Sequence, residues 1–166
     1  MNLEELRAAQ APLKSRYKSE PATALVTLRS QGSPEVASQT CRVETHIGEV
    51  VAGLHPAAGG AAGTACSGDM LLQALVGCAG VTLGAVATAL GVVLRSGRIV
   101  ASGEIDFRGT LGVVRDAPVG FKSIALSFEL DTDAAPETVA KLLELTERYC
   151  VVYQTLKHPP ALSSQV

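Results

Sequence analysis

The chain of 166 residues has no tryptophan, and it has only three phenylalanines and three tyrosines. A core without bulky aromatic side chains has to be packed from Ala, Val, Leu and Gly, whose small size lets backbones approach closely. Apolar residues make up 47% of the chain, which is enough to fill a core. The length fits a single domain over residues 1–166, or one protomer of an intimate oligomer.

Concentrated charge is also missing. The formal net charge is −2, and lysine and arginine are scattered rather than grouped. A nucleic-acid surface needs a basic patch, so we expect no nucleic-acid partner. The stretch Met1–Arg7 is charged and lacks the apolar centre of a signal peptide. We therefore expect a cytoplasmic protein whose thiols are reduced.

The four cysteines, at positions 41, 66, 78 and 150, form no C-x-x-C pair. The three histidines do not complete a zinc-ligand spacing either, so a metal site is not expected. The Gly59–Gly63 loop lacks the G-K-[S/T] sequence of a phosphate cradle. Its glycines instead indicate a flexible turn between a strand and a helix.

The longest apolar stretch runs from Met70 to Leu94 without a formal charge. Apolar residues occupy nearly every face, which predicts a helix buried all round. Such a stretch is long enough for a transmembrane helix. Its glycines, its alanine-rich composition and polar residues such as Gln73 and Thr82 favour a soluble alternative. That alternative is a central helix enclosed by a sheet and by another helix, or by its own copy in a dimer.

The remaining pattern predicts an α+β fold. Alternating residues predict strands, and three- and four-residue spacing after Pro136 predicts a helix that turns Cys150 toward the core. The expected elements are a short helix over 2–10, a strand over Ala22–Arg29, a turn over Gln31–Pro34, a hairpin over Val36–His46 and Glu49–Leu54, strands over Arg98–Arg108 and Lys122–Asp131, and the helix from Pro136.

Cys78 and Cys150 raise the functional question. A cysteine in a core helix is usually a small hydrophobic residue. Two cysteines placed in two helical segments are alternatively a nucleophile and its resolving partner. The residues alone leave both interpretations open.

The segments Gly59–Gly63, Asp69–Cys78 and Glu147–Val152 together resemble the OsmC/Ohr family of osmotically inducible and organic hydroperoxide resistance proteins. The resemblance covers residues 22–157, with 1–21 as an N-terminal extension and 158–166 as a tail. It implies antiparallel sheets wrapped around a long buried central helix in an intertwined homodimer. It also implies thiol-dependent reduction of organic hydroperoxides by Cys78 and Cys150.

In this resemblance Cys78 is the peroxidatic thiolate, Cys150 the resolving thiol, and a dithiol the reductant, with no metal or organic cofactor. The family adds an arginine near the first strand, for which Arg29 is the best-placed candidate, ahead of Arg16 and Arg42. The family's glutamate ten residues before the first cysteine is replaced by Gly68. The adjacent Asp69 either orients the arginine or caps the helix.

A second departure from the family pattern is Val151, which stands where a proline usually follows the second cysteine. These departures indicate a divergent member. They leave open a non-peroxidase alternative that binds a small apolar ligand at the dimer interface. Cys41 is expected to be a bystander, and Cys66, just before the Cys78 helix, stays ambiguous.

Overall fold

The computed structural model describes residues 2–166. The chain divides into two compact units, and each is described by itself. The helical unit comprises the residues up to Thr27 together with Leu75–Ile99 and Phe128–Val166. The sheet unit comprises Leu28–Ala74 and Val100–Ser127.

The described residues form an α+β fold. The helices are α1 (Leu3–Ser19), α2 (Ser67–Leu90), α3 (Phe107–Thr110), α4 (Pro136–Tyr149) and α5 (Val151–Lys157), with short 3-10 turns η1 (Pro21–Ala24) and η2 (Pro56–Ala58). The strands are β1 (Gly32–Glu35), β2 (Thr40–Thr45), β3 (Gly48–Gly53), β4 (Ala65–Cys66), β5 (Ser96–Ile105) and β6 (Phe121–Asp131). The mixture of antiparallel sheets and a long helix confirms the predicted fold class.

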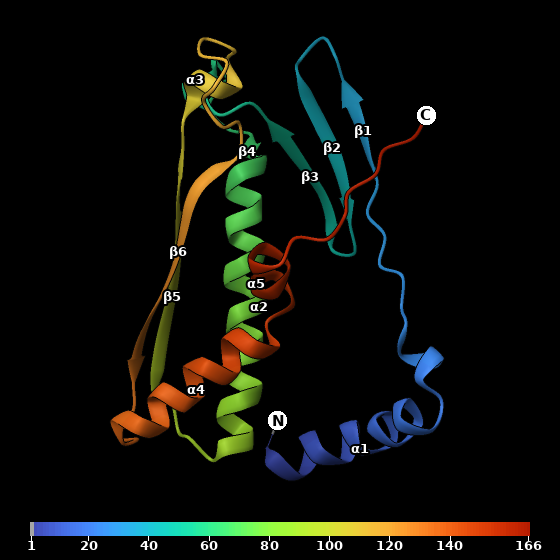
Figure 1. Cartoon of the computed structure of the whole chain (residues 1–166), viewed down its shortest axis with the longest axis vertical. Helices are drawn as coiled ribbons and strands as arrows, with labels where there is room; N and C mark the ends of the chain where they lie inside the picture. The colour runs from blue at the N-terminus through green and yellow to red at the C-terminus, as the bar shows by residue number, and fades with distance from the viewer. Residues whose placement is uncertain (1) are drawn as a thin grey trace. The chain divides into compact units, whose positions relative to one another are not determined.

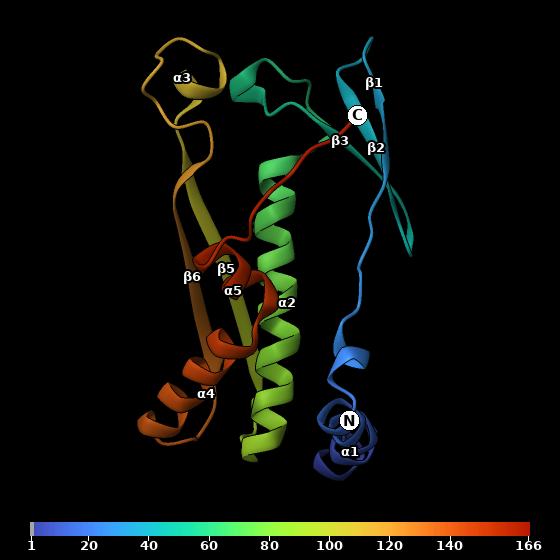
Figure 2. The ribbon, with the colours of Figure 1, turned by 45° about the vertical axis from the view of Figure 1, so that its right-hand side comes forward.

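The sheet unit contains an antiparallel meander, β1–β2–β3, which Figure 2 shows as a twisted ribbon. Val43 pairs with Val50 across the predicted hairpin, and the turn lies at His46 and Ile47. The two-residue strand β4 pairs in parallel with β3 and leads directly into α2. The predicted glycine-rich loop, Gly59–Gly63, therefore lies between β3 and β4.

The core of the helical unit lies where α2 and α4 pack together. Leu142 of α4 is fully buried and clusters with Leu83, Val86 and Ala87 of α2. Ile99 and the β6 residues Phe128 and Leu130 are among the partly buried side chains packed on this cluster. Figure 1 shows α4 crossing α2 beside the paired ends of β5 and β6.

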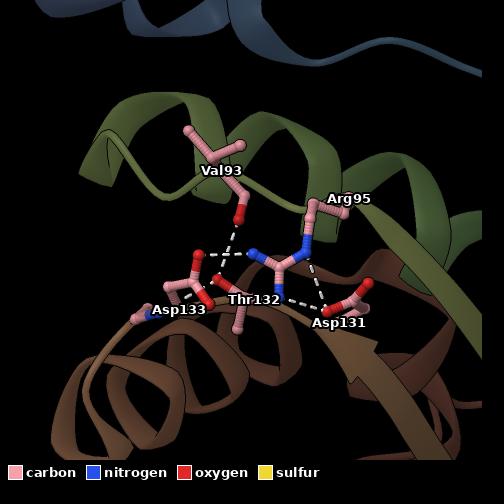
Figure 3. Close-up of polar contacts among 6 residues, drawn as sticks. Val93, Arg95, Asp131, Thr132 and Asp133 are labelled. Carbon is pink, nitrogen blue, oxygen red and sulfur yellow. Dashed lines mark hydrogen bonds and ion pairs between the residues drawn. The ribbon is translucent and has the colours of Figure 1, made fainter.

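A charged cluster joins the start of β5 to the end of β6 (Figure 3). The Arg95 guanidinium donates through Nε to Asp131 at 3.0 Å and also bonds Asp133. The Thr132 hydroxyl donates to the Val93 carbonyl at 2.8 Å. These contacts fix the connection between α2 and the hairpin that follows it.

Two expectations about the N-terminal third are wrong, and the helix expected over 2–10 is present but longer. Ala22–Arg29 is not a strand, because η1 occupies its start and the rest is unpaired extended chain. The segment Gln31–Pro34 is mostly strand β1 rather than a turn, and the first helix extends to Ser19 despite Pro12. A strand needs a neighbour to bond with, and Leu25 and Leu28 are 86% and 87% exposed in the described chain.

The prediction that the long helix is buried all round is also wrong for a single chain. Val81 is 78% exposed, while Leu75 and Ala79 on another face are buried. By length and composition α2 is apolar enough to cross a membrane, and 28% of its most apolar window is buried. The packing against α4 and β6 described above gives the buried part of α2 a place in a protein core.

Candidate active site around Cys78 and Cys150

Two thiols meet between α2 and the start of α5. Cys78 lies midway along α2, one residue before the fully buried Ala79, and its own side chain is partly buried. Cys150 has no exposed surface and lies between α4 and α5. The Cys150 thiol hydrogen-bonds the Cys78 sulfur. The helical stripe predicted to turn Cys150 inward thus delivers it to Cys78.

Cys150 is the single residue that separates α4 from α5. Its φ of −74° and ψ of 109° are extended, so the helix stops there and restarts at Val151. The Cys150 N–H completes α4 by donating to the Thr146 carbonyl at 2.9 Å. The Cys150 Sγ accepts from the Tyr153 N–H at 3.5 Å and serves as the N-cap of α5. The break persists although Val151 replaces the proline of the family pattern.

The pKa of the Cys78 thiol lies below its ordinary value. Burial raises this pKa, but hydrogen bonds to the sulfur outweigh the burial. The donors are the backbone N–H groups of Val152 and Val151, the Cys150 thiol and the Thr82 hydroxyl. Hydrogen bonds to a thiolate favour the charged form, which is the reactive form of cysteine.

The pKa of Cys150 moves the other way. Burial raises it first, and the neighbouring Cys78 sulfur raises it further, although the N–H groups of Tyr153 and Val152 oppose this. The Cys78 thiol therefore loses its proton at a lower pH than the Cys150 thiol does. This division suits a nucleophile and a resolving thiol.

Comparison with known proteins identifies the family of this chain. Residues 60–165, well over half of the chain, match the family model described as "OsmC-like protein". The chain belongs to the OsmC-like protein family. A comparison with curated protein sequences gives no match for this OsmC-like protein.

Solved structures share the OsmC-like fold at low sequence identity. An OsmC-like protein from Mycoplasma pneumoniae is 14% identical, with a TM-score of 0.68 over 81% of this chain and 89% of that one. An organic hydroperoxide resistance protein from Legionella pneumophila is 14% identical, with a TM-score of 0.59 over 81% and 91%. The organic hydroperoxide resistance protein OhrB of Bacillus subtilis is 16% identical, with a TM-score of 0.54 over 81% and 93%.

Sequence reasoning found the two cysteines of this OsmC-like protein but missed the groups that lower the pKa of Cys78. Thr82 follows Cys78 by four residues, a helical spacing that signals contact on one face. The N–H groups of Val151 and Val152 carried no signal, because every residue except proline has one. The family resemblance pointed only to an arginine near Cys78 and gave no sign of these backbone donors.

The other predicted site residues, Arg29 and Asp69, belong to the sheet unit. Arg29 is exposed on the unpaired segment before β1 and lines a cavity with Glu44 and His46. Asp69 is exposed in the first turn of α2, inside the helix rather than at the residue that caps it. Their roles beside Cys78 stay predictions.

A second cavity of the OsmC-like chain, of about 580 Å³, surrounds the start of α2 in the sheet unit. Gly68 and Cys66 line it together with Ile105 and Phe121. A Cβ atom added at Gly68 would lie 3.5 Å from both Ile105 and Phe121, an ordinary contact distance. The position without the family's glutamate thus faces an open space whose lining combines Ile105 and Phe121 with charged residues such as Asp106 and Lys122.

Among residues 2–166, no cluster of His, Cys, Asp and Glu has the arrangement of a metal site. Cys41 lies on β2 with its Sγ 3.9 Å from the Arg42 carbonyl, and Cys66 ends β4. Neither lies in the pair formed by Cys78 and Cys150. The groups that can react at the pair are the thiols of Cys78 and Cys150.

Proposed function

We propose that this OsmC-like protein reduces organic hydroperoxides through Cys78 and Cys150. The observation that carries this proposal is the hydrogen-bonded thiol pair with divided pKa values, lowered at Cys78 and raised at Cys150. Two solved relatives with the same fold are described as organic hydroperoxide resistance proteins, which supports the choice of oxidant.

The proposed reaction balances with a dithiol as the reductant. The Cys78 thiolate attacks the peroxide oxygen that does not carry carbon, so the O–O bond breaks and the alkoxide leaves as an alcohol after protonation. Cys78 is then a sulfenic acid. The Cys150 thiol displaces its hydroxyl as water and forms a disulfide. Two thiols of the reductant return both cysteines to the reduced form and become a disulfide themselves.

We further propose a cytoplasmic homodimer as the working form. One exposed stripe of α2 includes the small uncharged residues Ala74, Gly77, Val81 and Gly84, at three- and four-residue spacing. The unpaired segment that includes Leu25 and Leu28 has apolar side chains and free strand-forming backbone. A second copy that covers both would bury apolar surface that water otherwise contacts.

We retain Arg29 as the proposed cation for the peroxide site, with Asp69 as the carboxylate that orients it. A guanidinium near the reacting oxygens would stabilise the leaving alkoxide. The backbone donors at Val151 and Val152 already favour the Cys78 thiolate. Replacing Arg29 by glutamine should therefore lower peroxide turnover strongly and raise the pKa of Cys78 only slightly.

The deciding experiment measures loss of tert-butyl hydroperoxide with dithiothreitol as the dithiol. The Cys78→Ser protein should show no protein-dependent consumption, while the Cys41→Ser control should match the original chain. The Cys150→Ser protein should give one fast turnover and a sulfenic acid that dimedone traps at Cys78. Undiminished consumption by Cys78→Ser would end the proposal.

A neighbouring cavity of about 370 Å³, which also borders Gly68 and has a mainly apolar lining, favours a second candidate function, binding of a small apolar ligand. Its walls include Phe121 and Ile105, and the absence of a side chain at Gly68 keeps it open. Gly68→Leu should fill the cavity and abolish binding of a hydrophobic fluorophore without changing peroxide consumption. Fluorophore binding that is the same in Gly68→Leu would contradict this second function.

A further inference from the structure

A cavity of about 430 Å³ in the helical unit reaches Cys150 from the end of α4 and the start of α5. Besides Cys150, its lining includes Arg148, Tyr149, Gln154 and His158, and it ends at the tail. Neither Cys78 nor any other residue of α2 lines it. Cys150 therefore borders a cavity on the α4–α5 side, and Cys78 does not.

We propose that the reductant enters this cavity, attacks the Sγ of Cys150 in the Cys78–Cys150 disulfide, and carries negative charge. This inference rests on the proposed function in one respect, because that function forms the disulfide. It adds which sulfur is attacked, by which route, and what class of thiol is preferred.

The charge of the cavity supports an anionic reductant. Arg148 is cationic and exposed, and it lines the cavity together with His158. No acidic residue lines the cavity. The nearest in sequence is Glu147, whose carboxylate hydrogen-bonds the Tyr153 hydroxyl. A thiol with a carboxylate, phosphate or sulfonate group would therefore be concentrated at this opening.

Exposed side chains border the cavity at Cys150. The Cys150 sulfur has no exposed surface in the reduced protein, but the neighbouring Tyr149 and Val151 are 59% and 69% exposed. Exposed side chains change rotamer within nanoseconds. In-line attack also requires the nucleophile to approach Cys150 from the side opposite the leaving sulfur of Cys78. Cys78 belongs to α2, and no residue of α2 lines the cavity.

The chemistry of exchange favours the same sulfur. The reductant thiolate forms a bond to the Cys150 Sγ, the S–S bond breaks, and Cys78 leaves as a thiolate. A second thiolate attacks the mixed disulfide on the reductant's sulfur, which frees Cys150 to take up a proton. A thiol of lower pKa leaves faster, and the pKa of Cys78 is the lowered one.

The first test maps the attacked sulfur. Diamide converts the full chain to the disulfide without any peroxide, so the test does not depend on hydroperoxide being the substrate. The disulfide is mixed briefly with 2-mercaptoethanesulfonate, quenched with acid and N-ethylmaleimide, and digested for mass spectrometry. We expect the mercaptoethanesulfonate adduct on Cys150 and the maleimide on Cys78. The reverse distribution, or failure of diamide to form the disulfide, would overturn the proposal.

The second test measures the role of charge. Arg148→Glu should slow reduction by 2-mercaptoethanesulfonate about tenfold at low salt and leave reduction by the neutral 2-mercaptoethanol nearly unchanged. Arg98→Gln removes an exposed cation of β5 outside the cavity and should change neither rate. An equal slowing of both thiols by Arg148→Glu would contradict the preference for an anionic reductant. If both tests give the expected results but the protein does not consume hydroperoxide, only the proposed function is overturned.

Discussion

Replacing Val151 by proline tests whether a backbone N–H activates Cys78. Val151 is the first residue of α5, where proline fits because no helical acceptor is lost there. A proline also favours an extended residue before it, and Cys150 is already extended, with φ −74° and ψ 109°. The substitution should therefore preserve the fold and delete one of the hydrogen bonds to the Cys78 sulfur.

The expected size of the effect follows from the lost bond. A hydrogen bond to a charged group contributes about 1.5–3 kcal/mol, and one pKa unit corresponds to about 1.4 kcal/mol. Cys78 is only partly buried and keeps the Val152 N–H, so the lower end applies. We expect Val151→Pro to raise the pKa of Cys78 by about one unit.

The assay is the pH profile of Cys78 alkylation by iodoacetamide, read by mass spectrometry of the peptide. Below both pKa values the variant has about tenfold less thiolate, but each thiolate is about threefold more nucleophilic. It should therefore react about threefold more slowly at low pH and about threefold faster at high pH. Val151→Ala keeps the N–H and should match the original profile. Profiles of Val151→Pro and Val151→Ala that coincide would refute the reasoning.

Three further predictions concern stability. Leu142→Ala should lower the free energy of unfolding by about 2–5 kcal/mol in urea, because the side chain is fully buried in the core of the helical unit. A loss below 1 kcal/mol would contradict this packing. Arg95→Gln should lower the free energy of unfolding only slightly at low salt, since its partner Asp131 is half-exposed, and Arg98→Gln should lower it less. High salt should remove the Arg95 effect. Folding lowers the pKa of Cys78, so its ionisation stabilises the reduced protein above the unfolded pKa of about 8.5 and that contribution is lost as pH falls through the folded pKa. The stability difference between the original chain and Cys78→Ala should grow as pH rises to about 8.5, and a constant difference would contradict it.

The sequence was sufficient for elements whose pattern is complete within one chain. The uncharged stretch beginning at Met70 predicted α2 by its length and apolar content. The alternation after Lys122 predicted β6, because burial on one side leaves a periodic trace. The same reasoning placed Cys150 on the buried stripe of α4. These features depend on side-chain type at regular spacing.

The sequence was insufficient where structure depends on partners or on the backbone. Ala22–Arg29 has strand-like residues, but pairing depends on a neighbour that the described chain does not offer to Leu25 or Leu28. The lowered pKa of Cys78 depends on backbone donors at Val151 and Val152, which residue type does not reveal. Such contacts become visible only when the chain ends one helix at Cys150 and begins another.

The single-residue joint at Cys150 connects oxidation to the order of the last helix. The first three N–H groups of α5 donate to sulfur: that of Val151 to Cys78, that of Val152 to both cysteines, and that of Tyr153 to Cys150. An unpaired N–H at a helix start is a cost that these sulfur atoms now relieve. A disulfide has no thiolate to accept such bonds, so its formation weakens the start of α5. Amide hydrogen exchange at residues 151–153 would therefore report the redox state of the pair directly.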